Sequence, residues 1–248
     1  MKRIEKGVEP SGLATFRSQN PQATWNDFRN EAREAYDELV DEMCERQHGL
    51  CAYCEIDLLK WHQNRLVCSV DHFHPKSDLQ DGKNWGLEYD NLFLCCRGGS
   101  AKHDEASGHY LDPRKENLSC DAKKADRVLD GSVLTPFMVP RSPMIFKIIK
   151  SGAIEHNPDN CHAVGMDVLL VQKTIDEFGL NCNRLKRARE MIWKSLAAQV
   201  NTMPEMLDYS PLIQKYLTPD QNNRLTPFFS TIRAFFGKQS EAFLSKEA

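Results

Sequence analysis

Six of the nine cysteines in this chain of 248 residues lie within one stretch of 70 residues. Two of them, Cys51 and Cys54, have the spacing with which a tight turn presents two thiolates to one metal ion. An odd number of cysteines argues against a disulfide framework, so we expect reduced thiols and a metal site. A sulfur-bound ion at this point would lock the fold of the segment around it.

Zinc prefers four soft ligands in a tetrahedron, so Cys51 and Cys54 require a second pair. We predict that Cys96 and Cys120 complete this zinc site. Cys95 stands beside Cys96 and stays open as its alternative, because two adjacent cysteines can hardly bind one ion without strain. The competing interpretation is a reduced cysteine pair under a turn.

A second chemistry is indicated by residues 70–76, which read Val-Asp-His-Phe-His-Pro-Lys. A neutral imidazole can take a proton from water near physiological pH, so His72 is a candidate general base. Asp71 offers the hard carboxylate oxygens that Mg²⁺ prefers. If the strand ends here, the two side chains can flank one phosphate. The pair therefore predicts metal-assisted hydrolysis of a phosphodiester bond.

Further residues extend this candidate site. Asp121 follows Cys120, so bound zinc would hold it rigidly as a second carboxylate ligand for Mg²⁺ or Mn²⁺. Asn91 could fix the base or its loop through amide hydrogen bonds. His103 and His109 lie in a polar insertion and stay open as alternatives to Asp121 for the last metal ligand. We expect His74, by contrast, to be a surface residue.

The formal net charge is −3, whereas a sequence-specific DNA-binding domain is typically basic. Bound metal, local basic patches or a partner would therefore supply the contacts to phosphate. No apolar stretch approaches the ~20 residues that span a bilayer. The basic start of the chain is not followed by the apolar core of a signal peptide. We expect a cytoplasmic protein that does not contact membranes.

The hydrophobic pattern predicts several elements. Residues 1–23 look irregular, with Gly7, Pro10, Gly12 and Pro21 as punctuation. A helix begins at Thr24 with a capping box to Asp27 and ends at Gly49. Residues 66–70 read as a strand, 92–94 as a second short apolar run, and 144–156 as a hairpin with a Ser151-Gly152 turn.

The chain after Cys161 has helical periodicity. One expected apolar face comprises Val164, Val168, Leu169 and Ile175. Gly179 would end that helix, Asn183 would cap the next, and Leu185, Ala188, Ile192 and Leu196 would face inward. Pro204 and Pro219 divide the remainder into two helices. Arg184, Lys186, Arg187, Arg189 and Lys194 form a basic helix that either contacts phosphate or faces solvent.

Taken together, residues 51–54, 70–76, 91–92 and 120–124 resemble the HNH, or ββα-metal, endonucleases. The resemblance is closer to the retron-associated and Septu-type HNH proteins, the PtuB group of anti-phage defence systems, and covers residues 1–130 well. It implies an α+β fold in which a zinc-stapled ββα-metal (HNH) core carries an N-terminal helix and a helical C-terminal region. We place the arm, helix and core in residues 1–157 and the helical region in residues 158–248.

The resemblance also implies roles. His72 would be the base, Asp71 and Asp121 metal ligands, and Asn91 the middle residue of the HNH name. The chain departs from the family at its last position, where Asp121 replaces the usual His or Asn. The insertion between residues 98 and 119 also separates two zinc ligands that most members keep close.

The expected partners are nucleic acid (DNA or tRNA), a PtuA-like ATPase and, in some systems, a retron reverse transcriptase with its RNA–DNA product. The helical C-terminal third would then be a docking surface or plain scaffold. Two other functions remain open. The chain could be a catalytically silent zinc-binding module that recognises nucleic acid or a partner, or a toxin that cuts RNA.

Overall fold

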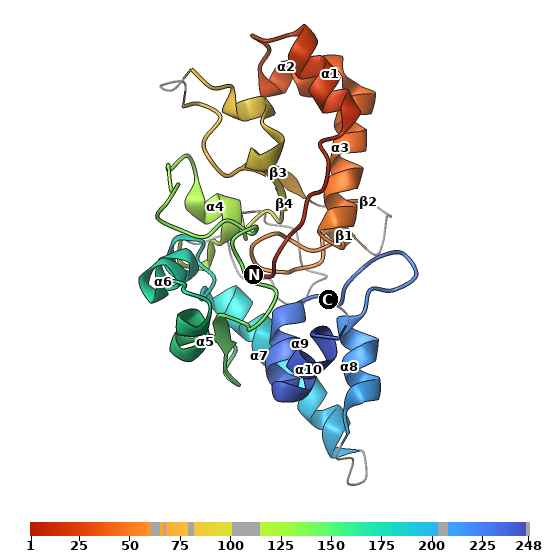
Figure 1. Cartoon of the computed structure of the whole chain (residues 1–248), viewed down its shortest axis with the longest axis vertical. Coiled ribbons are helices and arrows are strands. Elements are labelled where there is room, and N and C mark those ends of the chain that lie inside the picture. The colour runs from red at the N-terminus through yellow and green to blue at the C-terminus, as the bar shows by residue number, and fades with distance from the viewer. Residues whose placement is uncertain (61–64, 67, 79–81, 101–114, 203–207, 247–248) are drawn as a thin grey trace.

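The computed structural model describes residues 1–60, 65–66, 68–78, 82–100, 115–202 and 208–246. Three N-terminal helices form one end of the molecule, a short hairpin with a small helix lies at the centre, and the C-terminal helices form the other end (Figure 1). This mixed arrangement of helices and small sheets agrees with the expected α+β class. Within the described residues, no helix is both long and apolar enough to cross a membrane.

The N-terminal end consists of α1 (Ser11–Gln19), α2 (Trp25–Glu31) and α3 (Arg33–Arg46). The predicted capping box is confirmed, because Asp27 N donates to Thr24 Oγ1 and Thr24 N donates to Asp27 Oδ2. The single long helix was wrong. Ala32 leaves helical geometry, with φ −117° and ψ 54°, and separates α2 from α3.

Helix α1 lies where an irregular arm was expected. Gly12 and Pro10 looked like punctuation, but Pro10 precedes the first turn and Gly12 lies inside the helix. A Cβ atom on Gly12 would come within 2.6 Å of Ala35 Cβ on α3. The glycine therefore allows α1 to lie directly against α3, with Leu13 fully buried between them and the core.

The centre of the molecule is an antiparallel pair of β3 (Ser69–His72) and β4 (Leu92–Cys95). All of β4 is buried, and the register sets Asp71 opposite Phe93 and His72 opposite Leu92. The connection contains 3₁₀ turns η1 (Trp85–Leu87) and η2 (Tyr89–Asn91). The predicted strand at 66–70 starts only at Ser69, and Val67 lies outside the described residues.

Small elements flank this centre. Strands β1 (Leu59–Lys60) and β2 (Arg65–Leu66) form a separate pair, and η4 (Lys115–Asn117) leads into α4 (Cys120–Lys124). The hairpin predicted at 144–156 is confirmed as β5 (Phe146–Ile148) and β6 (Ile154–His156). Its turn requires Gly152, because a Cβ there would lie 1.9 Å from the carbonyl oxygen of Lys186.

The chain then forms α5 (Pro158–Ala163), α6 (Val168–Glu177), α7 (Asn183–Asn201), α8 (Ser210–Leu217), α9 (Phe229–Phe236) and α10 (Lys238–Leu244).

Three described helices, rather than two, follow residue 204. Gly179 follows α6 in the left-handed region, as predicted. Ile175 is buried and Val164 and Val168 pack against the core, as expected, but Leu169 is 73% exposed and Val171 is buried in its place. Asn183 is the first helical residue of α7, and Cys182 is its cap.

Two apolar clusters lie end to end. The larger packs the N-terminal helices, the hairpin and the start of α7, including Leu185 and Ala188. The smaller surrounds Leu196 with α8, α9 and α10. Helix α7 contributes to both clusters and so joins the central elements to the C-terminal end. The division of the chain at residue 157 stays a prediction.

Candidate metal centres and active site

Four buried thiols converge at the centre of the molecule. The Sγ atoms of Cys51, Cys54, Cys96 and Cys120 all lie within 4.8 Å of one another. The pairs Cys51–Cys120 and Cys96–Cys120 are 3.8 Å apart, and Cys54–Cys96 are 3.6 Å apart. Zn–S bonds of ~2.3 Å in a tetrahedron require sulfur atoms ~3.8 Å apart. The donor set therefore fits one zinc ion.

Backbone hydrogen bonds explain how the thiols of Cys51 and Cys54 come close to that of Cys96. Cys51 and Cys54 lie in a turn after α3 that is closed by a hydrogen bond from Cys51 N to Ile56 O. Ala52 N donates to Leu94 O at 3.0 Å, which joins this turn to β4. Cys96 directly follows β4. Cys95 points elsewhere, with its Sγ 3.2 Å from Ser69 Oγ, so Cys96 belongs to the cluster and Cys95 does not.

The insertion after Cys96 closes at its base. Ser119 N donates to Gly98 O at 2.9 Å. A Cβ atom on Gly98 would lie 2.1 Å from Ser119 O, so only glycine permits this approach. Residues 101–114 of this insertion, with His103 and His109 among them, lie outside the described residues. The long sequence separation of Cys96 and Cys120 thus does not separate them in space.

The C-terminal helices support the cluster. Cys120 N donates to Phe178 O at 2.8 Å, at the end of α6. Arg184, at the start of α7, is buried, and its Nη2 donates to Ser119 Oγ at 2.6 Å. That hydroxyl lies 3.5 Å from the sulfur of Cys120. The guanidinium thus places a positive charge beside thiols that would be anionic when they bind metal.

Burial and mutual hydrogen bonds shift the pKa of three of these thiols. Hydrogen bonds from Cys120, Cys51 and Cys54 hold the pKa of Cys96 well below its ordinary value. Burial raises the pKa of Cys54 and of Cys120. Hydrogen bonds from the neighbouring thiols therefore stabilise the thiolate form of Cys96, which is the form that binds metal.

The carboxylate of Asp71, on β3, contacts three neighbouring side chains. Lys124 Nζ lies 3.1 Å from its Oδ1, and the hydroxyl of Tyr53 donates a short hydrogen bond to its Oδ2. Asp121 is its third neighbour. Burial, then the charge of Asp71 and a hydrogen bond with it, raise the pKa of Asp121 to about 7. Two carboxylates in contact repel one another when both are charged, so a cation between them would be stabilised.

His72 is buried beside this pair. Its Nε2 donates to the carbonyl oxygen of Gly86 at 3.1 Å, because a carbonyl can only accept. The other ring nitrogen, Nδ1, is therefore the one that can accept a proton. The imidazole also meets the edge of Trp25, with ring centroids 4.8 Å apart. Burial and then the charge of Lys76 lower the pKa of His72 to about 4, so the ring is neutral at pH 7.

Asn91 fixes the chain that follows His72. Its Oδ1 accepts from His74 N at 2.7 Å, and its Nδ2 donates to His74 O at 2.9 Å and to Trp85 O at 2.8 Å. His74 was wrongly expected at the surface. It is buried, stacked on Trp85, with ring nitrogens 2.9 Å from Asp130 and 3.2 Å from Asp78.

The structure thus brings the four predicted cysteines together and sets Asp121 against Asp71. The charge of Asp121, on α4, also acts on His72. Across the described ranges, however, the four cysteines are the only set of three or more ligand atoms close enough to hold one ion. Asp71 and Asp121 would have to share an ion with water or substrate oxygens.

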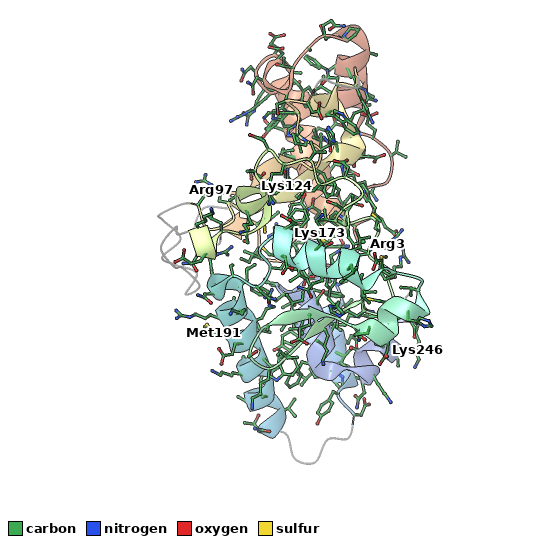
Figure 2. All side chains as sticks on the ribbon, turned by 90° about the vertical axis from the view of Figure 1, so that its left-hand side faces the viewer. Arg3, Arg97, Lys124, Lys173, Met191 and Lys246 are labelled. Atoms are coloured by element: carbon green, nitrogen blue, oxygen red, sulfur yellow. The ribbon has the colours of Figure 1, made fainter. Side chains whose placement is uncertain are left out.

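Some contributors escaped the sequence analysis. Lys124 and Tyr53, which both contact Asp71, were not among the predicted site residues. Figure 2 shows Lys124 on α4, between the two ends of the molecule. The basic face predicted for α7 was partly wrong. Arg184 and Arg189 are buried, and Arg189 Nε donates to Gly152 O at 2.6 Å.

Comparison with known proteins agrees with this geometry. A curated protein of Escherichia coli named "Retron Ec83 putative HNH endonuclease" is 36% identical over 211 residues, covering 77% of this chain and 79% of the relative. The chain belongs to the HNH endonuclease family. No protein-family model matches the chain.

As an HNH endonuclease, the protein is a hydrolase of nucleic acid. Its four-cysteine cluster fits zinc, and HNH nucleases use divalent metal ions. The name of the relative assigns that protein to a retron.

Proposed function

We propose that β3, β4 and α4 form the ββα-metal core of this HNH endonuclease and that zinc bound by the four cysteines staples it together. The order of elements supports this assignment, because Cys96 ends the second strand and Cys120 begins the helix. A closed set of four buried thiols leaves no open position for substrate. We therefore assign the zinc a structural role.

We infer a second, catalytic ion, Mg²⁺ or Mn²⁺, held by Asp71 and Asp121. The observation that carries this proposal is the contact between these two carboxyl groups beside a neutral His72. Mg²⁺ commonly binds through one or two carboxylates and completes its shell with water and phosphate oxygens. When bound, such an ion neutralises the charge that develops on the phosphate during hydrolysis.

His72 is the general base in this proposal. Nδ1 takes a proton from a water molecule, the water oxygen bonds to phosphorus, and the bond from phosphorus to the leaving sugar oxygen breaks. The Gly86 carbonyl keeps the proton on Nε2 and so leaves Nδ1 available. Asn91 holds the backbone at residue 74 and fixes the chain that carries the base.

The biological setting is also a proposal. The similarity to a retron protein supports an effector nuclease of a Septu- or retron-type anti-phage system. We propose a PtuA-like ATPase as partner, with a retron reverse transcriptase and its RNA–DNA product in some systems. The helical region 158–248 is the proposed docking surface. Such a partner would supply phosphate contacts that a chain with net charge −3 lacks overall.

Cleavage assays with matched variants test the catalytic assignment. His72→Ala should lower Mg²⁺- or Mn²⁺-dependent cleavage of DNA or tRNA by ~10²–10⁴-fold while zinc content stays unchanged. His162→Ala removes an exposed histidine from α5 and should keep full activity. Cleavage that survives His72→Ala would reject His72 as the base. Wild-type protein that binds zinc and cleaves neither substrate with its partner present would favour the silent binding module.

A further inference from the structure

A cavity of about 570 Å³ opens beside His72. Its walls come from the turn before α2 and the first residues of that helix (residues 21–26), from residues 76–77 after β3, and from residues near η1. Two of its lining residues, Trp25 and Gly86, are the ones that hold the imidazole of His72. The cavity and the base therefore share a wall.

The charge of this cavity differs from that of the whole chain. Its described lining contains two lysines, Lys76 and Lys83, and no aspartate or glutamate, although the chain carries −3 overall. Both lysines are exposed at the rim. The remaining polar lining is neutral and comprises Gln22, Thr24, Asn26, Ser77 and Asn84. Such a surface suits a polyanion with hydrogen-bonding groups.

Both lysines belong to the one connection between β3 and β4, Lys76 near its start and Lys83 near its middle. Lys83 Nζ lies 4.0 Å from the ring centroid of Trp85 and 3.5 Å from Glu88 Oε2, so its ammonium group is held by the ring and by a carboxylate that is not among the lining residues. Lys76 follows Pro75, four residues after the proposed base. A strand whose phosphates contact both lysines would pass the side of His72 that Trp25 and Gly86 cover.

We propose that this cavity, here called the lysine cavity, holds the nucleic-acid strand next to the phosphate that is cut, with Lys76 and Lys83 as its phosphate contacts. The inference rests on the proposed function, because it assigns a substrate subsite to the same catalytic centre. The chemistry recognised is a sugar–phosphate backbone, which DNA and RNA share. The lining shows no preference between them, so the experiment includes both.

Equilibrium binding tests the lysine cavity without cleavage. Full-length His72→Ala protein is titrated with a fluorescein-labelled DNA duplex and with RNA of the same sequence, and anisotropy is recorded at several salt concentrations. Lys76→Gln with Lys83→Gln should weaken binding. It should also reduce the slope of log affinity against log salt by ~0.9 per lysine on duplex DNA, or ~0.7 on single strands.

Two further variants separate the cavity from general charge effects. Lys173→Gln removes an exposed lysine from α6, on another part of the surface, and should leave affinity and slope unchanged (Figure 2). Gln22→Lys adds a positive charge to the cavity rim and should tighten binding. A gain of affinity cannot arise from misfolding, which makes this variant the stronger test.

The outcomes distinguish a failure of the lysine cavity from a failure of the proposed nuclease function. Unchanged affinity and slope in the double lysine variant would overturn the lysine cavity, and cleavage by the wild type would leave the proposed nuclease function standing. An equal loss with Lys173→Gln would also reject the cavity, because binding would then be diffuse. A wild type that neither binds nor cleaves DNA or RNA would overturn both. A loss of affinity for DNA alone or for RNA alone would support the cavity and identify its substrate.

Discussion

The ammonium group of Lys124 lies 3.1 Å from a carboxylate oxygen of Asp71, and both side chains are almost completely buried. The same ammonium donates to the carbonyl oxygen of His72 at 2.8 Å. One residue at the end of α4 therefore joins the proposed metal ligand to the backbone of the proposed base. These two contacts hold α4 against β3 and so position the proposed metal ligand relative to the proposed base.

Removing this ammonium should destabilise the protein strongly. Lys124→Met leaves the carboxylate of Asp71 buried without its cation, a change that typically costs ~3–5 kcal/mol. Urea unfolding of the metal-free protein measures the loss. Lys123→Met, on the same helix but only half-buried, should cost much less. Adding Asp71→Asn to Lys124→Met should recover part of the loss, and purely additive losses would show that the pair does not interact.

Zinc content should separate the two adjacent cysteines. Cys96→Ser removes one of the four converging sulfurs, so the purified variant should lose zinc. Cys95→Ser should retain it, because Cys95 contacts Ser69 and lies outside the cluster. Elemental analysis after dialysis against a mild chelator makes the comparison. Equal zinc loss in both variants would contradict the assignment.

Arg184 should control how firmly zinc is held. Arg184→Gln removes the buried positive charge that contacts Ser119 beside Cys120, so transfer of zinc to a coloured chelator should be ~10–100-fold faster. Arg187→Gln changes an exposed arginine on the same helix and should leave the transfer rate as in the wild type. Identical rates for both variants would limit Arg184 to a packing role.

Binding of the second ion should depend on pH through Asp121. Its pKa is raised to about 7, so below pH 7 the ion must displace a proton. Affinity for Mn²⁺, followed by electron paramagnetic resonance, should therefore fall about tenfold per pH unit below 7. Asp121→Asn should bind weakly with little pH dependence. A wild-type affinity that is constant from pH 5 to 8 would argue against Asp121 as a ligand.

The protonation of Asp121 also affects the free energy of unfolding of the metal-free protein. Between about pH 4 and pH 7, folded Asp121 holds a proton that the unfolded chain has already lost. Its contribution therefore makes stability fall as pH rises through this range. Asp121→Asn should remove that contribution, so the variant gains stability relative to the wild type as pH rises from 4 to 7. Urea midpoints across this range measure the difference, and a constant difference would contradict the prediction.

The sequence allowed the cysteine cluster to be predicted because ligand spacing is a local property. Cys51 and Cys54 have a zinc-knuckle spacing, and Cys120 lies in a family motif beside Asp121. Sequence could not decide between Cys95 and Cys96. That choice depends on which side of β4 faces the turn at residue 51, and the strand pairing fixes it.

Residues that act over long sequence distances were missed. Lys124 contacts Asp71 across 53 positions and Arg184 contacts Ser119 across 65, so no local pattern indicates either pair. Basic residues on a helix usually suggest a solvated face, which misled the interpretation of Arg184. Gly12 resembled a helix breaker in the sequence. The glycine is needed there because α1 approaches Ala35 on α3 closely, and only the tertiary structure reveals this contact.

Anomalous diffraction from crystals grown with Zn²⁺ and Mn²⁺, recorded at both absorption edges, tests the two-centre account most directly. The account predicts a zinc peak enclosed by Cys51, Cys54, Cys96 and Cys120 and a manganese peak between Asp71 and Asp121, on the side that His72 Nδ1 can reach. A manganese peak far from both carboxylates, or an ordered cysteine cluster with no zinc peak, would contradict it.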